Sequence, residues 1–241
     1  MKIELTFNGS TYSADLDKGH DLSLPVGRAN EGSAYGIPNS EIRIYRDGGF
    51  VGDVSAGGSC NVREIRLNPH GNGTHTECVG HVSKEYRTLS ETIQKSHFIA
   101  ELVSIETQVA IRAEDLKKAR KHTSTEALII RSLPNTLDKR SKNWLGTEPP
   151  YMSNEAMALL VEWGINHLLL DLPSVDSETD PHLQSHKVFW NYPSEKYSIR
   201  TITELIYVND AIEDGLYLLN LQCAPIELDA VPSKPIIYSL R

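Results

Sequence analysis

One short stretch, Asn68–His81, constrains the local fold of this chain more than any other. It reads N-P-H-G-N-G-T-H-T-E-C-V-G-H, so three histidines and one carboxylate lie among glycines that permit sharp bends. His75 and Glu77 are two residues apart, and in an extended segment both side chains leave the same face. Glu77 and His81 are four apart and share a face if a helical turn follows. The stretch therefore predicts a segment that runs into a helical turn and aims all three side chains at one point.

The chemistry of this stretch has two interpretations at this level. Clustered imidazole and carboxylate groups suit zinc or a similar divalent metal. The same spacing also fits a polar loop whose side chains only bond to one another. The residues of the stretch leave both interpretations open, and metal binding or catalysis is favoured.

The stretch resembles the signature of the cyclase family, which includes bacterial kynurenine formamidases and isatin hydrolases. The family motif reads H-x-G-T-H-x-D-x-P-x-H or a close variant, and the matching positions here are Gly73, Thr74, His75, Glu77 and His81. Three positions depart from it. Glu77 replaces aspartate, Val79 replaces proline, and Gly71 stands where the family has its first histidine, with His70 one residue away.

Other stretches extend the resemblance along the chain. Asp21-Leu22-Ser23, followed by Leu24-Pro25, is similar to the family's D-L-S-x-P start, and Asp171–Asp176 is similar to its D-x-P-S-I-D stretch. Ser174 has no serine-hydrolase context, so turn-forming and supporting roles are expected in this stretch. His186, preceded by Ser185, matches a metal-ligand histidine, whereas His182 is expected at the surface.

Glu204 matches the family's second metal-ligand glutamate. It lies among the apolar residues Ile202, Leu205 and Ile206, where a carboxylate requires a partner. A metal ion would provide that partner.

The resemblance implies a fold and an assembly. The sequence alone indicates a mixed α/β or α+β domain, because strands outnumber helices. Cyclase-family proteins have a swivelling β/β/α-type fold with a mixed, barrel-like sheet flanked by helices, and they assemble as homodimers or homotetramers. We expect the same of this chain.

The resemblance also implies an activity: hydrolysis of a linear or cyclic amide, of formamide type, by a metal-activated water. The cofactor would be one or two divalent ions, zinc or manganese. His75 and Glu77 would bind the first, with His70 as a third ligand. Glu77 would bridge to a second ion held by His186 and Glu204. His81 would be the general acid/base.

The alternative is a non-catalytic binding protein that keeps the fold around a degenerate site. Gly71, in place of a histidine, supports it. The persistence of charged and imidazole groups elsewhere in the motif argues against it. Cofactor-dependent redox chemistry is set aside because no Gly-rich dinucleotide fingerprint is present.

Length, charge and cysteine content limit the domain number, the partners and the cellular compartment that the chain can have. A chain of 241 residues with 39% hydrophobic content suits one large domain, residues 1–241, or two small ones, and we favour one. A formal charge of −8 argues against nucleic acid or an anionic membrane as partner, so a small-molecule substrate is expected. The chain lacks a signal-peptide pattern and a spanning apolar run. With three cysteines and no metal-binding pair spacing, a reducing cytoplasm is predicted.

Alternation and turn signals predict the elements around the site. Residues 1–17 form a β-hairpin with its turn at Asn8-Gly9, and Glu41–Arg46 and Val62–Leu67 are expected to be strands. Further strands are expected at 98–105, 127–130, 165–172, 198–208, 216–224 and 234–240, with helices at 113–122 and 153–163. The Gly-rich turn Ala56–Ser59 lacks the lysine and helix of a phosphate loop.

Two loops are expected to carry specificity, since binding residues concentrate on loops that strands hold in place. They are Gly27–Asn39 and Asn135–Tyr151. Trp144 and Tyr151, in the second loop, would line a substrate pocket, with ordinary packing as the alternative.

Overall fold

A closed barrel of seven strands dominates the computed structural model, which describes residues 1–27, 31–194 and 197–241. The strands follow one another around the barrel in the order β15-β9-β11-β13-β14-β8-β16, and β16 pairs with β15 to close it. Their bounds are β8 His75–Glu77, β9 His97–Glu106, β11 Ala127–Leu133, β13 His167–Leu170, β14 Thr201–Glu204, β15 Gly215–Cys223 and β16 Ala230–Ser239. A short eighth strand, β3 (His20–Asp21), adds to the edge of β16.

The barrel is mixed, with parallel and antiparallel pairs. β9, β11, β13 and β14 are mutually parallel, whereas β8, β15 and β16 pair antiparallel to their neighbours. The continuous apolar runs of β11 and β13 follow from this position, because both faces of a central parallel strand are covered. Ala127 and Ile129 pack with side chains from β9, β15 and β16 inside the barrel, and Leu128 and Ile130 pack against the helices outside.

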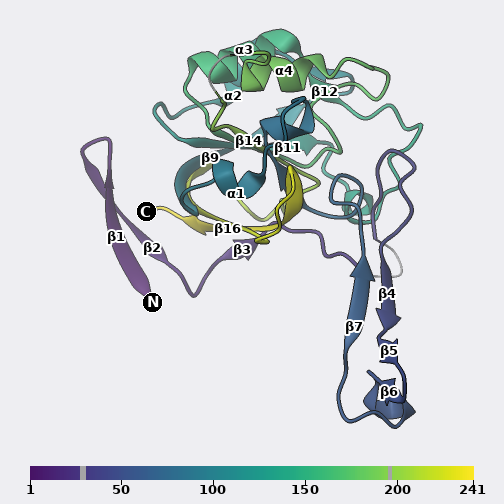
Figure 1. Cartoon of the computed structure of the whole chain (residues 1–241). Coiled ribbons are helices and arrows are strands. Elements are labelled where there is room, and N and C mark those ends of the chain that lie inside the picture. Colours follow the sequence, from purple (N-terminus) through teal and green to yellow (C-terminus); the bar gives the residue numbers. More distant parts are fainter. Residues whose placement is uncertain (28–30, 195–196) are drawn as a thin grey trace.

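Three helices cover one side of the barrel: α2 (Ala113–Ala119), α3 (Asn154–Glu162) and α4 (Gln184–Trp190) (Figure 1). The Ser153 side chain caps α3 by accepting a hydrogen bond from the Ala156 N–H, which satisfies a free donor of the first turn. A one-turn helix, α1 (Leu89–Thr92), lies near β16. None of the helices in the described part of the chain is long and apolar enough to cross a membrane.

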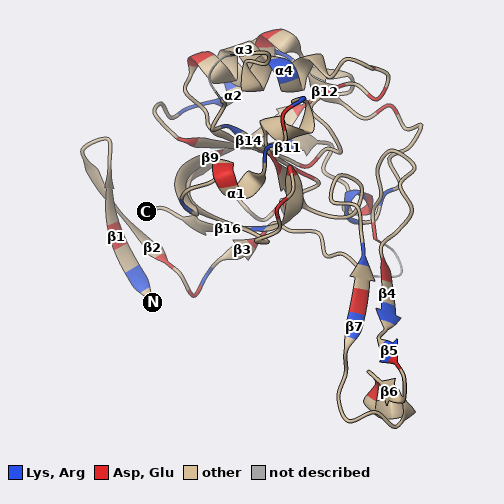
Figure 2. Cartoon of the chain, in the orientation of Figure 1, with Lys and Arg blue, Asp and Glu red and all other residues tan. Residues whose placement is uncertain are grey.

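Two hairpins extend away from the barrel in Figure 1. The predicted N-terminal hairpin is confirmed as β1 (Lys2–Phe7) and β2 (Ser10–Asp15), with Asn8 and Gly9 at positive φ in its turn. The second is a longer arm whose base is β4 (Glu41–Ile44) paired with β7 (Arg63–Arg66). Both strands lie within stretches predicted as strands. Its tip holds β5 (Arg46–Asp47), β6 (Phe50–Val51) and the 3₁₀ turn η1 (Val54–Ala56). Acidic and basic residues alternate along the arm (Figure 2).

The expectation of a mixed α/β fold with a barrel-like sheet and few helices is confirmed at that level. The bounds of individual strands differ from the predicted ones. The clearest case is the strand predicted over 198–208, which is regular only over Thr201–Glu204. Leu205 has φ +55°, so the chain turns immediately after Glu204. Residues 28–30 of the predicted loop Gly27–Asn39 lie outside the described residues.

The second predicted loop, Asn135–Tyr151, is irregular apart from the 3₁₀ turn η3 (Leu137–Arg140) and β12 (Tyr151–Met152), which pairs with β10 (Ala110–Ile111). η3 places the Lys139 ammonium inside the protein, where its Nζ lies 2.9 Å from Asp171 Oδ2 and 2.6 Å from the Ser132 carbonyl oxygen. Burial raises the pKa of Asp171, and Lys139 opposes that rise. This buried ion pair fixes the loop to the end of β13.

We therefore predict that Lys139→Met destabilises the fold by about 3–5 kcal/mol, because Asp171 then loses its buried counter-charge. Chemical denaturation monitored by circular dichroism measures the loss. Lys118→Met, at an exposed site on α2, is the matched control and should change the free energy of unfolding by less than about 0.5 kcal/mol. Equal stabilities of the two variants would contradict the role given to Lys139.

Candidate metal centre

The site is built around Glu77, which is fully buried on β8. β8 lies between β14 and β16, with Glu77 opposite Ile202 on one side and Ala230 on the other. His75 and Glu77 leave the same face of the strand, as their spacing predicted. The side chain between them, Thr76, faces the other way and bonds to Thr203 Oγ1 at 2.8 Å. The strand thus directs His75 and Glu77 toward α4.

Three imidazoles surround the Glu77 carboxylate. His186 Nε2 lies 2.9 Å from Glu77 Oε1, and His70 Nδ1 lies 3.2 Å from Glu77 Oε2. His81 Nδ1 is 3.9 Å from the same Oε2, because the 3₁₀ turn η2 (Val79–His81) follows β8 and brings His81 back over it. Although burial opposes ionisation, His81 and His186 hold the pKa of Glu77 well below its usual value.

Glu204 supplies a second carboxylate at the end of β14. Its Oε2 is 3.5 Å from His75 Nε2, and its Oε1 is 3.7 Å from His186 Nε2. Oε1 also accepts the backbone N–H of Val175 at 3.1 Å, so the Asp171–Asp176 segment fixes its orientation. Glu204 is 2% exposed, which makes these contacts its main compensation for leaving water.

Asp176 holds His186 in its orientation. Its Oδ2 lies 2.5 Å from His186 Nδ1, while Oδ1 accepts the Ser185 N–H at the start of α4. With Nδ1 bound in this way, Nε2 faces Glu77, the arrangement typical of carboxylate-supported metal-binding histidines. Burial opposes a charge on His186, but Glu77 and then Asp176 outweigh it and raise the pKa of His186 to about 10. The predicted supporting role of the 171–176 segment is thus located in Asp176.

Packing explains why glycine, and not the family histidine, occupies position 71, and this was not apparent from the sequence. A Cβ at this position would lie 2.6 Å from the Cβ and Cδ1 of Ile37, so the space a family histidine would need is filled. His70 reaches the cluster instead, and its Nε2 bonds to Asp229 Oδ2 at 3.1 Å. Burial lowers the pKa of His70, but Asp229 and Glu77 outweigh that effect and raise it to about 10.

Asp229 belongs to the cluster and was missed from the sequence. It precedes β16, and its backbone carbonyl accepts the Cys78 N–H at 3.0 Å, which brings it beside the motif. Its Oδ2 lies 3.1 Å from His70 Nε2 and 3.6 Å from His81 Nδ1. Hydrogen bonds from His70 and His81 lower the pKa of Asp229. No motif marks it, because its place depends on how the barrel closes.

The arrangement fits a divalent cation. His75 Nε2 and Glu77 Oε2 are buried and make no hydrogen bond of regular geometry among the described residues. Their nearest charged neighbours are Glu204 Oε2, 3.5 Å from His75 Nε2, and His70 Nδ1, 3.2 Å from Glu77 Oε2. Three overlapping sets have ligand atoms within 4.8 Å of one another: His70, His75 and Glu77; Glu77, His81 and His186; His70, His81 and Asp229. Nitrogen and carboxylate oxygen donors of this kind suit zinc and manganese.

The predicted pocket residues, Trp144 and Tyr151, lie outside the donor cluster but beside Asp176. Trp144 is buried in the core and, with Tyr35, Ser174 and Asp176, lines a cavity of about 10 Å³, far smaller than a typical substrate pocket. Tyr151 is half-buried and lines an open depression with Asp176 and Ser185. The substrate roles of Trp144 and Tyr151 stay predictions. His182 is exposed, as expected.

Tyr35, in the loop predicted to lie over a site, was also missed. Its hydroxyl donates to the Pro173 carbonyl oxygen at 2.8 Å. Burial and then the charge of Glu204 raise the pKa of Tyr35, and Glu77 and Asp176 add to the rise. The described part of this loop therefore brings a phenol close to the carboxylates of the cluster.

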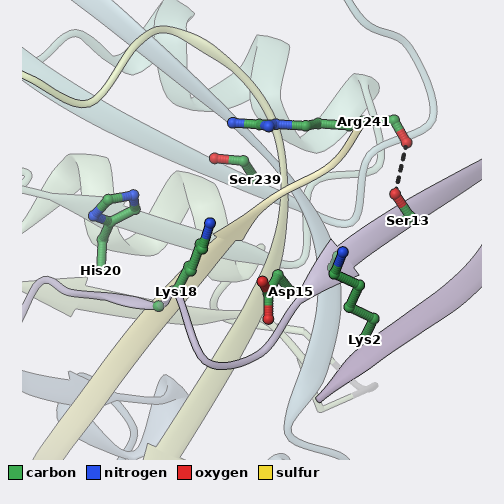
Figure 3. A pocket seen from close by; sticks show the side chains of 9 residues that line it. Lys2, Ser13, Asp15, Lys18, His20, Ser239 and Arg241 are labelled. Atoms are coloured by element: carbon green, nitrogen blue, oxygen red, sulfur yellow. Dashed lines mark hydrogen bonds between the residues drawn. The ribbon is translucent and has the colours of Figure 1, made fainter.

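A larger depression lies away from the cluster, between the N-terminal hairpin and the chain end (Figure 3). Its lining includes Lys2, Lys18, His20 and Arg241, and its volume is about 490 Å³. The Ser13 hydroxyl donates to the Arg241 carbonyl oxygen at 3.5 Å and joins the two chain ends there. None of the residues that line this depression belongs to the group of imidazoles and carboxylates. The candidate metal site is therefore the cluster around Glu77.

Comparison with known proteins decides the family. The sequence profile of the family described as "Putative cyclase" matches residues 20–177. The chain belongs to the cyclase family. A search among curated proteins finds no match.

Several solved structures share this fold across nearly the whole chain. The "predicted metal-dependent hydrolase from Bacillus stearothermophilus" is 15% identical, with a TM-score of 0.64 over 92% of this chain and 98% of its own. Isatin hydrolase A from Labrenzia aggregata is 12% identical, with a TM-score of 0.65 over 92% and 93%. A structure described as a novel cyclase is 13% identical, with a TM-score of 0.69 over 94% and 90%. At such identities the likeness establishes the fold alone.

The packing of Ile37 against Gly71 gives a prediction by double-mutant cycle. Gly71→Ala should destabilise the protein by about 1–3 kcal/mol, because the new Cβ overlaps Ile37. Ile37→Gly removes the overlapping atoms, so the double variant should be less destabilised than the sum of the two single changes. Thermal or urea unfolding of the four proteins measures the coupling. If the free-energy changes of the two single variants simply add in the double variant, Ile37 does not exclude a side chain at position 71.

Proposed function

We propose that this cyclase-family protein is a metal-dependent hydrolase that cleaves a linear or cyclic amide, of formamide type. The observation that carries the proposal is a pair of buried atoms that make no hydrogen bond of regular geometry, His75 Nε2 and Glu77 Oε2, inside a group of imidazoles and carboxylates. A bound cation would supply a partner for such atoms. The names of the similar structures, metal-dependent hydrolase and isatin hydrolase, support the same activity.

The chain offers ligands for one or two ions of zinc or manganese. His75, Glu77 and His70 would hold the first ion, and His70 would replace the family histidine absent at position 71. His186 and Glu204 would hold a second, with Glu77 between the two. Glu77 is one methylene longer than the family's aspartate, and its Oε2 lies 3.2 Å from the Nδ1 atom of His70.

The bound ion would lower the pKa of a coordinated water and polarise the substrate carbonyl. The other steps belong to the protein. His81 is partly exposed, with its Nδ1 3.9 Å from Glu77 Oε2, and it would take a proton from the attacking water and return it to the leaving nitrogen. Asp229 lies 3.6 Å from His81 Nδ1, so it would orient that imidazole and stabilise its protonated form. Asp176 would keep His186 in its orientation through Nδ1.

Substrate choice would come from the loops above the cluster. Tyr35 is the described loop residue that interacts most closely with its carboxylates. Trp144 and Tyr151 would contribute if the segment 135–151 moves when substrate binds, because the cavity beside Trp144 is too small as it stands.

We also propose a swivelling β/β/α-type fold, a homodimer or homotetramer, and a cytoplasmic location for this protein.

The alternative function is a non-catalytic binding protein with a degenerate site. Gly71 is its main support. Against it, His70 Nδ1 lies 3.2 Å from Glu77 Oε2, where it would replace the missing histidine.

The first functional prediction concerns metal content. Protein purified without chelator should contain zinc or manganese, or take up either when it is added, as measured by elemental analysis. His75→Ala should lose the ion, because a buried ligand is removed. His182→Ala is the matched control at an exposed histidine and should retain it. Trace metal with no uptake would contradict the hydrolase proposal.

The second functional prediction separates proton transfer from metal binding. His81→Ala should keep most of the metal and lose turnover by about 10²–10⁴-fold, because a general acid/base is removed. The assay begins with N-formyl aromatic amides and cyclic imides. If His81→Ala hydrolyses a substrate as fast as the unmodified protein, the role given to His81 is wrong. If metal-loaded protein turns over none of a broad amide and lactone panel, the binding-protein alternative is preferred.

A further inference from the structure

Arg87 is a half-buried cation without an acidic partner. In the described part of the chain its guanidinium forms no ion pair, and its Nε atom is buried without a hydrogen bond. Arg63, Arg120 and Arg131, by contrast, each pair with an aspartate or a glutamate. Because a charge that is partly removed from water requires a partner, Arg87 is available to an anion from outside the chain.

The ring of Tyr197 holds this guanidinium in place. The Cζ atom of Arg87 lies 3.5 Å from the centroid of the ring, which is the geometry of a cation–π contact. Glu85, two residues before Arg87, is exposed, and its Oε2 accepts the Ser83 hydroxyl at 2.7 Å instead. The ring covers one face of the guanidinium, whereas the N–H donors lie along its edge. A planar fork oriented in this way is suited to binding both oxygens of a carboxylate.

The backbone of Arg87 packs against the turn that carries His81. A Cβ atom at Gly80 would overlap the Arg87 carbonyl oxygen and would lie 2.9 Å from Asp229 Cβ. The Cys78 thiol also points toward this carbonyl, with its sulfur 3.9 Å from the oxygen. Arg87 therefore lies against η2 and beside the segment that carries Asp229.

The segment that carries Tyr197 also approaches His81. Trp190, at the end of α4, has its ring centroid 6.4 Å from that of His81. Its Nε1 donates a hydrogen bond to the Arg200 carbonyl oxygen at 3.0 Å, which brings residues 197–200 toward the same histidine. The stack of Arg87 on Tyr197 thus joins two segments that flank the imidazole.

The donor cluster meets solvent beside these segments. The side chains of His81 and Asp229 are 24% and 31% exposed, whereas those of Glu77 and Glu204 are 0% and 3% exposed. The chain has a net charge of −8, and its field opposes the approach of an anion. A cation without a partner at this place offsets that field for a substrate that carries a negative charge.

We propose that Arg87 binds a carboxylate of the substrate and so selects amides that carry one. The inference rests on the proposed function, because it takes the cluster around Glu77 as the place where the amide is cleaved. The carboxylate accepts hydrogen bonds from the edge of the guanidinium, and Tyr197 keeps that edge oriented. Arg87 determines specificity and takes no part in proton transfer.

Matched substrates test this selection. Formanilides with a carboxylate at the ortho, meta or para position are compared with the corresponding neutral carboxamides, and kcat/KM is measured for each. The unmodified protein should prefer the acid of at least one pair. In Arg87→Gln that preference should fall by roughly 10- to 100-fold, the loss typical of a hydrogen bond between charged groups. A ratio of two substrates cancels a general loss of stability, so a merely structural role of Arg87 would leave it unchanged.

Arg200→Gln is the matched control. Arg200 is also half-buried, and its Nε is buried without a hydrogen bond, but its guanidinium lies 5.9 Å from the ring of Phe189 on α4. The ratio of acid to carboxamide should not change in this variant. An equal fall in both variants, no fall in Arg87→Gln, or an unmodified protein that does not distinguish acid from carboxamide would overturn the proposal.

Two further changes give signals that simple loss of structure does not. Arg87→Glu should reverse the preference, so that a formanilide with an aminomethyl group, which is cationic, is favoured over the carboxylate. Tyr197→Phe keeps the ring face and should keep the preference, whereas Tyr197→Ala should weaken it. Loss of the preference in Tyr197→Phe as well would contradict the role given to the ring.

A binding measurement separates this proposal from the proposed hydrolysis. Isothermal titration of metal-loaded protein with the same acids and carboxamides needs no turnover. If no compound is hydrolysed, the hydrolase proposal fails, but tighter binding of an acid that is lost in Arg87→Gln still supports the role of Arg87. If acid and carboxamide are hydrolysed equally well, the hydrolase proposal stands and the role of Arg87 is wrong. Equal binding without hydrolysis would overturn both.

Discussion

The buried charge of Glu77 is the constraint on which the rest of the site depends. A carboxylate removed from water requires compensation, and three separate parts of the chain supply it. The turn after β8 returns His81, the glycine-interrupted loop before β8 delivers His70, and α4 brings His186. Closure of the barrel places β8 between β14 and β16, so the site exists only when the distant strands have paired. His75 Nε2 and Glu77 Oε2 still make no hydrogen bond of regular geometry among the described residues, as is expected of metal ligands.

The sequence predicted the site residues whose relative positions depend only on their spacing along the chain. His75 and Glu77 share a face because they are two residues apart on a strand, and β8 has that conformation. Family resemblance, and not spacing, indicated His186 and Glu204, which lie far along the chain and meet Glu77 only through the fold. Asp229 had no local signal, because its position follows from the pairing of β16 with β8. A packing contact, the filling of the space at position 71 by Ile37, could not be predicted from residue types alone.

The barrel and its helices hold the donor cluster in place, with Asp176 and Asp229 fixing the imidazoles that face Glu77. The arm formed by residues 41–66 projects away from the barrel, on the side remote from the helices α2, α3 and α4 (Figure 1). The elements that position the donors therefore belong to the barrel, its helices and the loops between them.

The central claim is that the unsatisfied atoms around Glu77 are metal ligands. Crystals of the protein grown with zinc, with diffraction recorded on both sides of the zinc absorption edge, test it most directly. The account predicts an anomalous peak bonded to His75 Nε2 at roughly 2.0–2.1 Å and to a Glu77 carboxylate oxygen at roughly 2.0–2.2 Å. It also predicts that the peak is absent in His75→Ala crystals grown in the same way. Zinc bound only at exposed histidines such as His182, with the cluster around Glu77 filled by water, would contradict it.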